Sequence, residues 1–247
     1  MYSLVNKNID DGAIQQINKE YQIYFLFVVF IVSLQLICNT IEPIIFSYGS
    51  FRAPASSIFY VLSFTVSDII TENFGFKLAV RATVLNVIAQ FIYCGIAAIV
   101  YIAPKQYLDS HAVNSFQYMF QFLSFELLGS IFSLVIAMIT NDYLINKLKL
   151  IFLGRGFWWR TIVSTVLGEI IMLNIDYNIT FMGSKSLSEI QHLIFSAMSY
   201  KVTAAFLLAL PAAALSRYVG RNIFYLRQSM NQKTYLIKEL KHALLFR

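Results

Sequence analysis

The chain has 247 residues, of which 58% are hydrophobic and 13% are charged, and its formal net charge is +6. A soluble domain carries roughly 25% charged residues, so this composition excludes an ordinary water-soluble domain and indicates a lipid bilayer as the surroundings. Transmembrane β-strands would be short segments of alternating polarity, and the sequence contains no such series. The expected fold is therefore an all-α, polytopic membrane protein.

Six apolar stretches are long enough to cross the hydrocarbon core, which takes about 20 residues of helix. They are predicted at 21–46, 54–74, 80–103, 117–140, 158–182 and 192–216. The residues before the first stretch mix acidic and basic side chains, unlike a cleaved signal peptide. Because the loops are too short for a soluble domain, we expect one integral membrane domain over 1–247. The longest cytoplasmic loop is predicted at 141–157.

Lys and Arg are unevenly distributed between the two sides of this topology. Most lie in the N-terminal segment, the second and fourth loops and the tail, whereas the other loops hold only Arg52, Lys105 and Lys185. Cytoplasmic loops carry the excess of Lys and Arg, so both termini are predicted to be cytoplasmic. This asymmetry accounts for the positive net charge, and no nucleic-acid partner is expected. The basic tail, 217–247, is expected to continue the sixth helix and then to lie on the anionic inner leaflet.

A short internal match links the second and fifth predicted spans. Residues 63–70, SFTVSDII, align with residues 164–171, STVLGEII, which pairs Asp68 with Glu169 and extends to Asn73 and Asn174. The two spans run in opposite directions in this topology, as they do in transporters built from inverted repeats with the ligand at the repeat interface. Two inverted three-helix repeats are one interpretation, and a chance match is the other.

Ionisable side chains at membrane depth are costly and indicate function by default. The candidates are Glu42, Asp68, Glu72, Glu126, Glu169, Asp176 and Lys201. Glu42 and Asp176 lie near span ends and can reach the interface, and Glu126 is either a ligand-binding group or a partner for another helix. At 1.5 Å per residue, Asp68 and Glu169 lie roughly 10 and 14 Å inside their spans, too deep for a carboxylate to reach water.

The spacing within the second span gathers its polar groups on one side. Thr65, Asp68 and Glu72 share a helical face through steps of three and four residues. Lys201, inside the sixth span, is the expected countercharge for one of the buried carboxylates. A paired site that binds a polar solute is the favoured interpretation, and an ion pair that only fixes helix packing is the alternative.

Motifs of the common enzyme and metal-binding classes are missing from the sequence. It contains no HExxH, no GxSxG, no Cys/His metal cluster and no Walker A motif. We therefore expect no enzyme activity, no metal site and no cofactor, and the chain carries no ATPase of its own to drive transport.

The stretch SDIITENFGFKLAVR, residues 67–81, resembles the signature of the vitamin uptake transporter family, the queuosine precursor transporters. The matching residues are Ser67, Asp68, Glu72, Gly75, Phe76, Lys77, Ala79 and Arg81. A second stretch, WWRTIVSTVLGEII, is similar to the family pattern in the fifth span. This chain departs from that pattern at Met172 and Leu173, where an acidic residue and Ser or Thr are usual. It also departs in the fourth span, where Met138 and Asn141 align with a Gln and an Asp.

The resemblance implies a six-helix secondary transporter in the bacterial inner membrane that imports a queuosine precursor for tRNA modification. The substrate would be a deazapurine nucleobase: 7-cyano-7-deazaguanine, 7-aminomethyl-7-deazaguanine or queuine. A carboxylate accepts hydrogen bonds from the adjacent N–H and amino groups of such a base, a role suited to Asp68 or Glu169. The predicted aromatic stacking partner is one of Phe64, Tyr60 and Phe74.

Other predicted roles and alternatives complete this interpretation. Glu126 and Asn174 belong to the predicted binding set, and Lys77 and Arg81 are expected to hold the cytoplasmic end. A carboxylate such as Glu169 would carry the proton if transport is proton-coupled, and facilitated diffusion is equally compatible. The alternatives are a substrate-binding subunit of an ATP-energised uptake system, a paralogue for another heterocycle, and a membrane protein that does not transport. The sequence predicts no oligomeric state.

Overall fold

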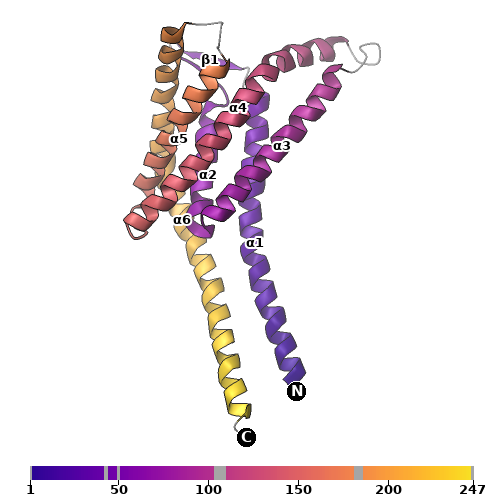
Figure 1. The fold of residues 1–247 in the computed structure, drawn as a ribbon, viewed down its shortest axis with the longest axis vertical. Coiled ribbons are helices and arrows are strands. Elements are labelled where there is room, and N and C mark those ends of the chain that lie inside the picture. The colour runs from indigo at the N-terminus through magenta and orange to yellow at the C-terminus, as the bar shows by residue number, and fades with distance from the viewer. Residues whose placement is uncertain (1, 42–43, 49–50, 103–109, 181–185, 246–247) are drawn as a thin grey trace.

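A computed structural model describes residues 2–41, 44–48, 51–102, 110–180 and 186–245 (Figure 1). These residues form six helices and one antiparallel hairpin, so the all-helical expectation is confirmed apart from the hairpin. In chain order the elements are α1 (Tyr2–Ile41), β1 (Ile45–Tyr48), β2 (Phe51–Pro54), α2 (Ser57–Phe74), α3 (Phe76–Ile102), α4 (Ser110–Ile151), α5 (Phe157–Thr180) and α6 (Leu187–Leu245).

Five of the described helices are long and apolar enough to cross a membrane. The apolar segments are Lys19–Ile41, Phe76–Val100, Gly129–Ile151, Phe157–Ile179 and Leu187–Tyr225. The remaining helix, α2, has 18 residues and carries more polar side chains. It packs against all five other helices, so its polar groups face protein. Six membrane crossings therefore remain a prediction that rests on α2.

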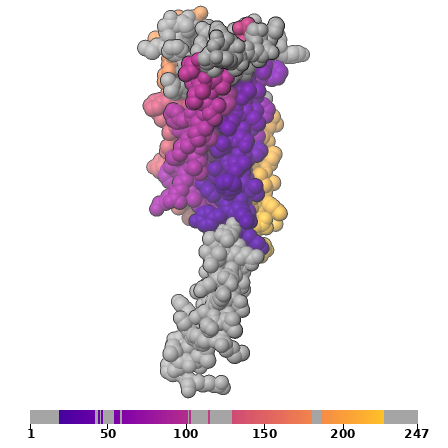
Figure 2. Space-filling model, turned by 90° about the vertical axis from the view of Figure 1, so that its right-hand side faces the viewer, coloured from indigo at the N-terminus to yellow at the C-terminus, as the bar shows by residue number. Residues whose placement is uncertain are grey.

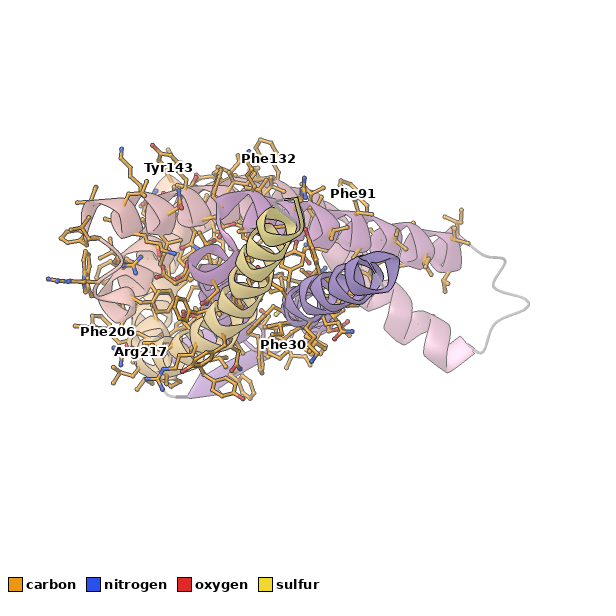
Figure 3. The ribbon with its side chains drawn as sticks, turned by 90° about the horizontal axis from the view of Figure 1, so that it is seen from below. Phe30, Phe91, Phe132, Tyr143, Phe206 and Arg217 are labelled. Atoms are coloured by element: carbon orange, nitrogen blue, oxygen red, sulfur yellow. The ribbon has the colours of Figure 1, made fainter. Side chains whose placement is uncertain are left out.

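The bundle has an apolar outer surface, as a helical membrane protein requires. Phe30, Phe91, Phe132 and Phe206 come from four different helices and are each about half exposed. Seen along the bundle in Figure 3, they point outward on different sides. Figure 2 shows α1 between α3 and α6, which agrees with its packing contacts. Polar side chains are instead buried between the helices, which is where a solute site would be built.

The first and last helices leave the bundle at the same end, called the lower end here (Figure 1). This placement agrees with an even number of crossings, and the cytoplasmic side of the termini stays a prediction. α2 runs down the bundle and α5 runs up it, as an inverted repeat needs (Figure 1). The repeat itself also stays a prediction.

Several predicted boundaries were wrong, and the helices are longer than hydropathy indicated. Residues 141–151, predicted as a loop, continue α4, because the basic residues there are good helix formers and no breaker precedes Gly154. α1 begins at Tyr2, and α6 continues through Leu245, as expected for the start of the tail, whereas its predicted position on the inner leaflet stays a prediction. The first predicted span ran to 46, but α1 ends at Ile41 and β1 follows.

Candidate functional site

Asp68 lies at the centre of the bundle, where α2, α4 and α5 meet. Its side chain is completely buried. The amide of Asn141 donates a hydrogen bond to Oδ1 at 2.7 Å. The hydroxyl of Thr161 donates to Oδ2, and those of Ser164 and Thr165 lie 3.4 Å from the same oxygen. Both carboxylate oxygens are therefore occupied by donors from two neighbouring helices.

A second buried carboxylate, Asp142, lies next to Asp68 where α4 contacts α2, and it was not predicted from the sequence as a site residue. It is fully buried on α4, and its Oδ1 accepts hydrogen bonds from Ser67 at 2.7 Å and Thr71 at 3.1 Å. Its Oδ2 has no hydrogen-bond partner in the part of the chain that the structure describes. Asp142 was assigned to the predicted loop 141–157. The missing breaker before Gly154 was the signal that could have placed it on a helix.

Glu169 and Lys201 form a buried ion pair between α5 and α6. Lys201 Nζ lies 2.6 Å from Glu169 Oε2, and both residues are at most 3% exposed. The ammonium also lies 5.5 Å from the ring centroid of Tyr60 on α2, within the range of a cation–π contact. Glu169 Oε1 is buried and has no hydrogen-bond partner among the described residues. The pair thus leaves one carboxylate oxygen available.

Two further predicted residues, Phe64 and Thr65, contribute mainly to packing in the observed conformation. A Cβ atom at Gly168 would lie 3.0 Å from Phe64 Cε1, so the missing side chain lets α2 and α5 approach closely. Phe64 is fully buried and packs in one apolar cluster with Met138 and Met172. The hydroxyl of Thr65 donates to the Val61 carbonyl of its own helix.

Glu72 lies at the lower end of the bundle, away from the pair formed by Glu169 and Lys201. Two guanidinium nitrogens of Arg160 donate to its carboxylate oxygens at 3.0 and 3.1 Å. Lys149 lies 3.8 Å from the same carboxylate and is more exposed. Lys77 and Arg81, expected to hold this end, are exposed. The cations at Glu72 come from α4 and α5, and the expected role of Lys77 and Arg81 at this end stays a prediction.

Of the last two members of the predicted binding set, the structure describes only the side chain of Asn174, which is not brought into these centres. Asn174 donates to the Ile170 carbonyl of its own helix at 2.7 Å. Glu126 lies on α4, but its side chain is outside the described residues, as is Glu42. The structure therefore leaves the predicted roles of Glu126 and Glu42 open.

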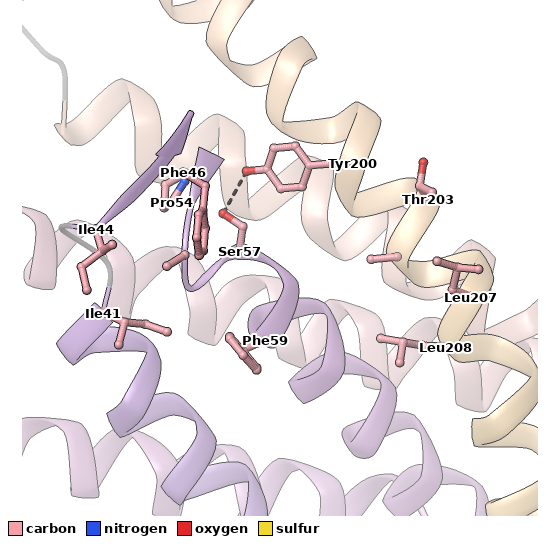
Figure 4. Close-up of a pocket in the computed structure, with 12 residues that line it drawn as sticks. Ile41, Ile44, Phe46, Pro54, Ser57, Phe59, Tyr200, Thr203, Leu207 and Leu208 are labelled. Carbon is pink, nitrogen blue, oxygen red and sulfur yellow. Dashed lines mark hydrogen bonds between the residues drawn. The ribbon is translucent and has the colours of Figure 1, made fainter. Parts of the chain in front are cut away.

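Pockets lie at both ends of the bundle. The upper pocket, shown in Figure 4, has a volume of about 920 Å³ and lies between the hairpin, α2 and α6. It is lined mostly by apolar side chains, with one hydrogen bond from Tyr200 to Ser57 at 2.9 Å. The lower pocket, of about 540 Å³, is lined by Glu72 and by basic residues that include Lys149 and Arg217. The buried polar centres lie between these two ends.

A helical bundle with five helices long and apolar enough to span a bilayer, among the residues that the structure describes, defines a multi-pass membrane protein. Residues 54–215, more than half of the chain, match the family described as "Putative vitamin uptake transporter", and the chain belongs to this family. The family indicates a transporter of a small molecule. No curated protein and no solved structure matches the chain.

Proposed function

We propose that the chain is a secondary transporter that imports a 7-deazaguanine precursor of queuosine across a bacterial inner membrane. The observation that carries this proposal is that Oε1 of Glu169 is buried and has no hydrogen-bond partner among the residues that the structure describes. A 7-deazaguanine presents a ring N–H beside an exocyclic amino group, and carboxylates bind such paired donors on base edges. Lys201 holds the other oxygen at 2.6 Å and orients the carboxylate.

Asp68 has a different role in this proposal, although the sequence made both Asp68 and Glu169 candidates for binding the base. Its two oxygens already accept hydrogen bonds from Asn141 and from the hydroxyl groups of α5. A substrate would have to displace those donors, whereas Glu169 needs no displacement. Asp68 therefore positions α2 against α4 and α5, and Glu169 contacts the base.

Tyr60 is the best placed of the three aromatic candidates. Its ring faces Lys201, which is paired with Glu169. Phe64 is packed against α5, and Phe74 makes an edge-to-face contact with Tyr24 at a centroid distance of 5.6 Å. Base stacking on Tyr60 would place the heterocycle next to the ion pair.

Two of the departures from the family pattern, Met172 and Leu173, lie three and four residues after Glu169 on α5 and so on the same side of the helix. Met172 packs in the cluster that contains Phe64, and Leu173 packs with Ile190 and Ile194 of α6. Both side chains therefore fill apolar interfaces between helices.

The test uses a bacterial strain that makes no queuosine precursor and lacks its own precursor transporter. The chain is expressed there, each deazaguanine is supplied at nanomolar concentration, and queuosine is assayed in tRNA. We expect restoration by the wild type and a loss of at least tenfold for Glu169→Gln at equal membrane level. Glu189→Gln is the matched control, because this exposed residue caps α6 and a glutamine also serves in a capping box.

Two results would count against the proposal. No restoration with any of the three precursors, despite inserted protein, would exclude this substrate class. Full restoration by Glu169→Gln would show that its carboxylate does not bind the substrate. Because the first variant removes the carboxylate that lies 2.6 Å from Lys201, the double variant Glu169→Gln/Lys201→Met is included, and it should be inserted normally and remain inactive.

A further inference from the structure

Four buried carboxamides lie on α1 and α3, two helices in contact, outside the centres described above. Gln35 and Asn39 lie on α1, and Asn86 and Gln90 lie on α3, with a spacing of four residues on each helix. Their exposed fractions are 3% or less. The two helices are in contact and run in the same direction (Figure 1). On each helix the two carboxamides are therefore one turn apart on the same face.

The upper pair of carboxamides is partly satisfied and the lower pair is not. Asn39 Nδ2 donates to Gln90 Oε1 at 3.3 Å. Four helical residues, or about 6 Å, below that contact lie Gln35 and Asn86. Within the described part of the chain, both polar atoms of Gln35 and of Asn86, and the Nε2 of Gln90, have no hydrogen-bond partner.

Simple helix packing does not account for this arrangement. Asn and Gln between membrane helices stabilise packing when they bond across the interface, as Asn39 and Gln90 do. A buried amide without a partner destabilises the fold, and leucine would fill the same space without this cost. Unpartnered groups on both helices therefore indicate a site for a hydrogen-bonding ligand.

The chemistry of these groups defines the class of ligand. The free atoms are two amide oxygens, which accept, and three amide nitrogens, which donate. The four side chains carry no charge, so they favour an uncharged ligand that presents donors and acceptors side by side. The lactam or aminopyrimidine edge of a planar heterocycle has this pattern, and Asn and Gln recognise base edges in the same way.

Tyr60 connects these carboxamides to the ion pair of the proposed transport site. Its hydroxyl lies 3.4 Å from Asn39 Oδ1, and its ring lies 5.5 Å from Lys201 Nζ. We propose that Gln35, Asn86 and Gln90 form a second binding site, beside Tyr60, for the donor–acceptor edge of an uncharged heterocycle. This inference rests on the proposed function only in that 7-cyano-7-deazaguanine is the first ligand tested. It gives the solute a second binding position across Tyr60 from Glu169.

The experiment compares Gln35→Leu, Asn86→Leu and their combination with wild type, purified in lipid nanodiscs. Binding of 7-cyano-7-deazaguanine, guanine, hypoxanthine and uracil is measured by calorimetry, and thermal unfolding is measured without ligand. Gln22→Leu is the matched control, because this glutamine lies on α1 and is exposed. We expect the two single variants to weaken binding at least tenfold while their unfolding temperature stays equal or rises by a few degrees.

The outcomes separate this inference from the proposed function. If wild type binds 7-cyano-7-deazaguanine and the leucine variants bind it equally well, the second site is wrong and the proposed function stands. If only another heterocycle binds, and its binding requires the amides, the proposed function fails and the site stands. Binding of none of the four probes, or a loss of binding together with a lower unfolding temperature, would overturn the second site.

Discussion

Replacing Glu72 with glutamine should destabilise the lower end of the bundle strongly, because it leaves Arg160 as an unpaired buried cation. Arg160 is completely buried, and its guanidinium donates twice to the Glu72 carboxylate. Breaking a buried ion pair by removing one partner costs about 3–5 kcal/mol. The Glu72 side chain is 14% exposed, which favours the lower value of about 3 kcal/mol.

Lys149 provides the matched comparison, because it contacts the same carboxylate from a more exposed position. Its Nζ lies 3.8 Å from the Glu72 carboxylate and donates a hydrogen bond to the Glu72 main-chain carbonyl at 2.5 Å, which Glu72→Gln leaves in place, and its side chain is 36% exposed. Exposed ion pairs contribute only about 0–1 kcal/mol. For a protein of this size, 1 kcal/mol shifts the midpoint of thermal unfolding by roughly 2–4 °C. Glu72→Gln should therefore lower the midpoint by about 6–12 °C, and Lys149→Gln by less than about 4 °C.

The assay is thermal unfolding of the purified protein, followed by tryptophan fluorescence at one heating rate, since membrane proteins often unfold irreversibly. The double variant Glu72→Gln/Arg160→Gln should recover part of the loss, because it removes the unpaired charge together with its partner. Equal shifts for Glu72→Gln and Lys149→Gln would refute the reasoning. The reasoning would also be refuted if the double variant lowered the unfolding midpoint by as much as Glu72→Gln and Arg160→Gln do together.

Three further predictions use the same unfolding assay. Gly168→Ala should lower stability by about 1–3 kcal/mol, because its Cβ would lie 3.0 Å from Phe64 Cε1. Gly95→Ala should be neutral or stabilising, because its Cβ would meet no atom within 4 Å. Equal effects of the two variants would contradict this prediction. Gly75→Ala should cost about 1–3 kcal/mol, since Gly75 has a φ of +90°, and an unchanged midpoint would disprove the strain. Asp142→Asn should leave the midpoint unchanged or raise it, because a neutral amide replaces a buried carboxylate with an unpartnered oxygen, and a clear decrease would show that the charge stabilises the fold.

The candidate site was predicted from the sequence in part, and the misses have physical causes. Asp68, Glu169 and Lys201 stood out because charge at membrane depth is visible in any single span. Asp142 was missed because hydropathy ended the fourth span too early. The carboxamides of α1 and α3 were missed because the candidates were chosen around ionisable groups and the family pattern, although the four-residue spacing of Asn and Gln on both spans was a usable signal.

The sequence by itself determined that the chain is embedded in a membrane as a helical bundle and carries the signature of a transporter family. These properties are local, because hydropathy accumulates over about 20 consecutive residues and a signature lies within one span. Only the tertiary structure decided which buried groups are paired and which are free. Glu72 and Arg160 are 88 residues apart, and Lys201 and Glu169 are 32 residues apart. Such partners are chosen by how whole helices pack, so the free oxygen of Glu169 and the unpartnered amides of α1 and α3 could be seen only in the folded bundle.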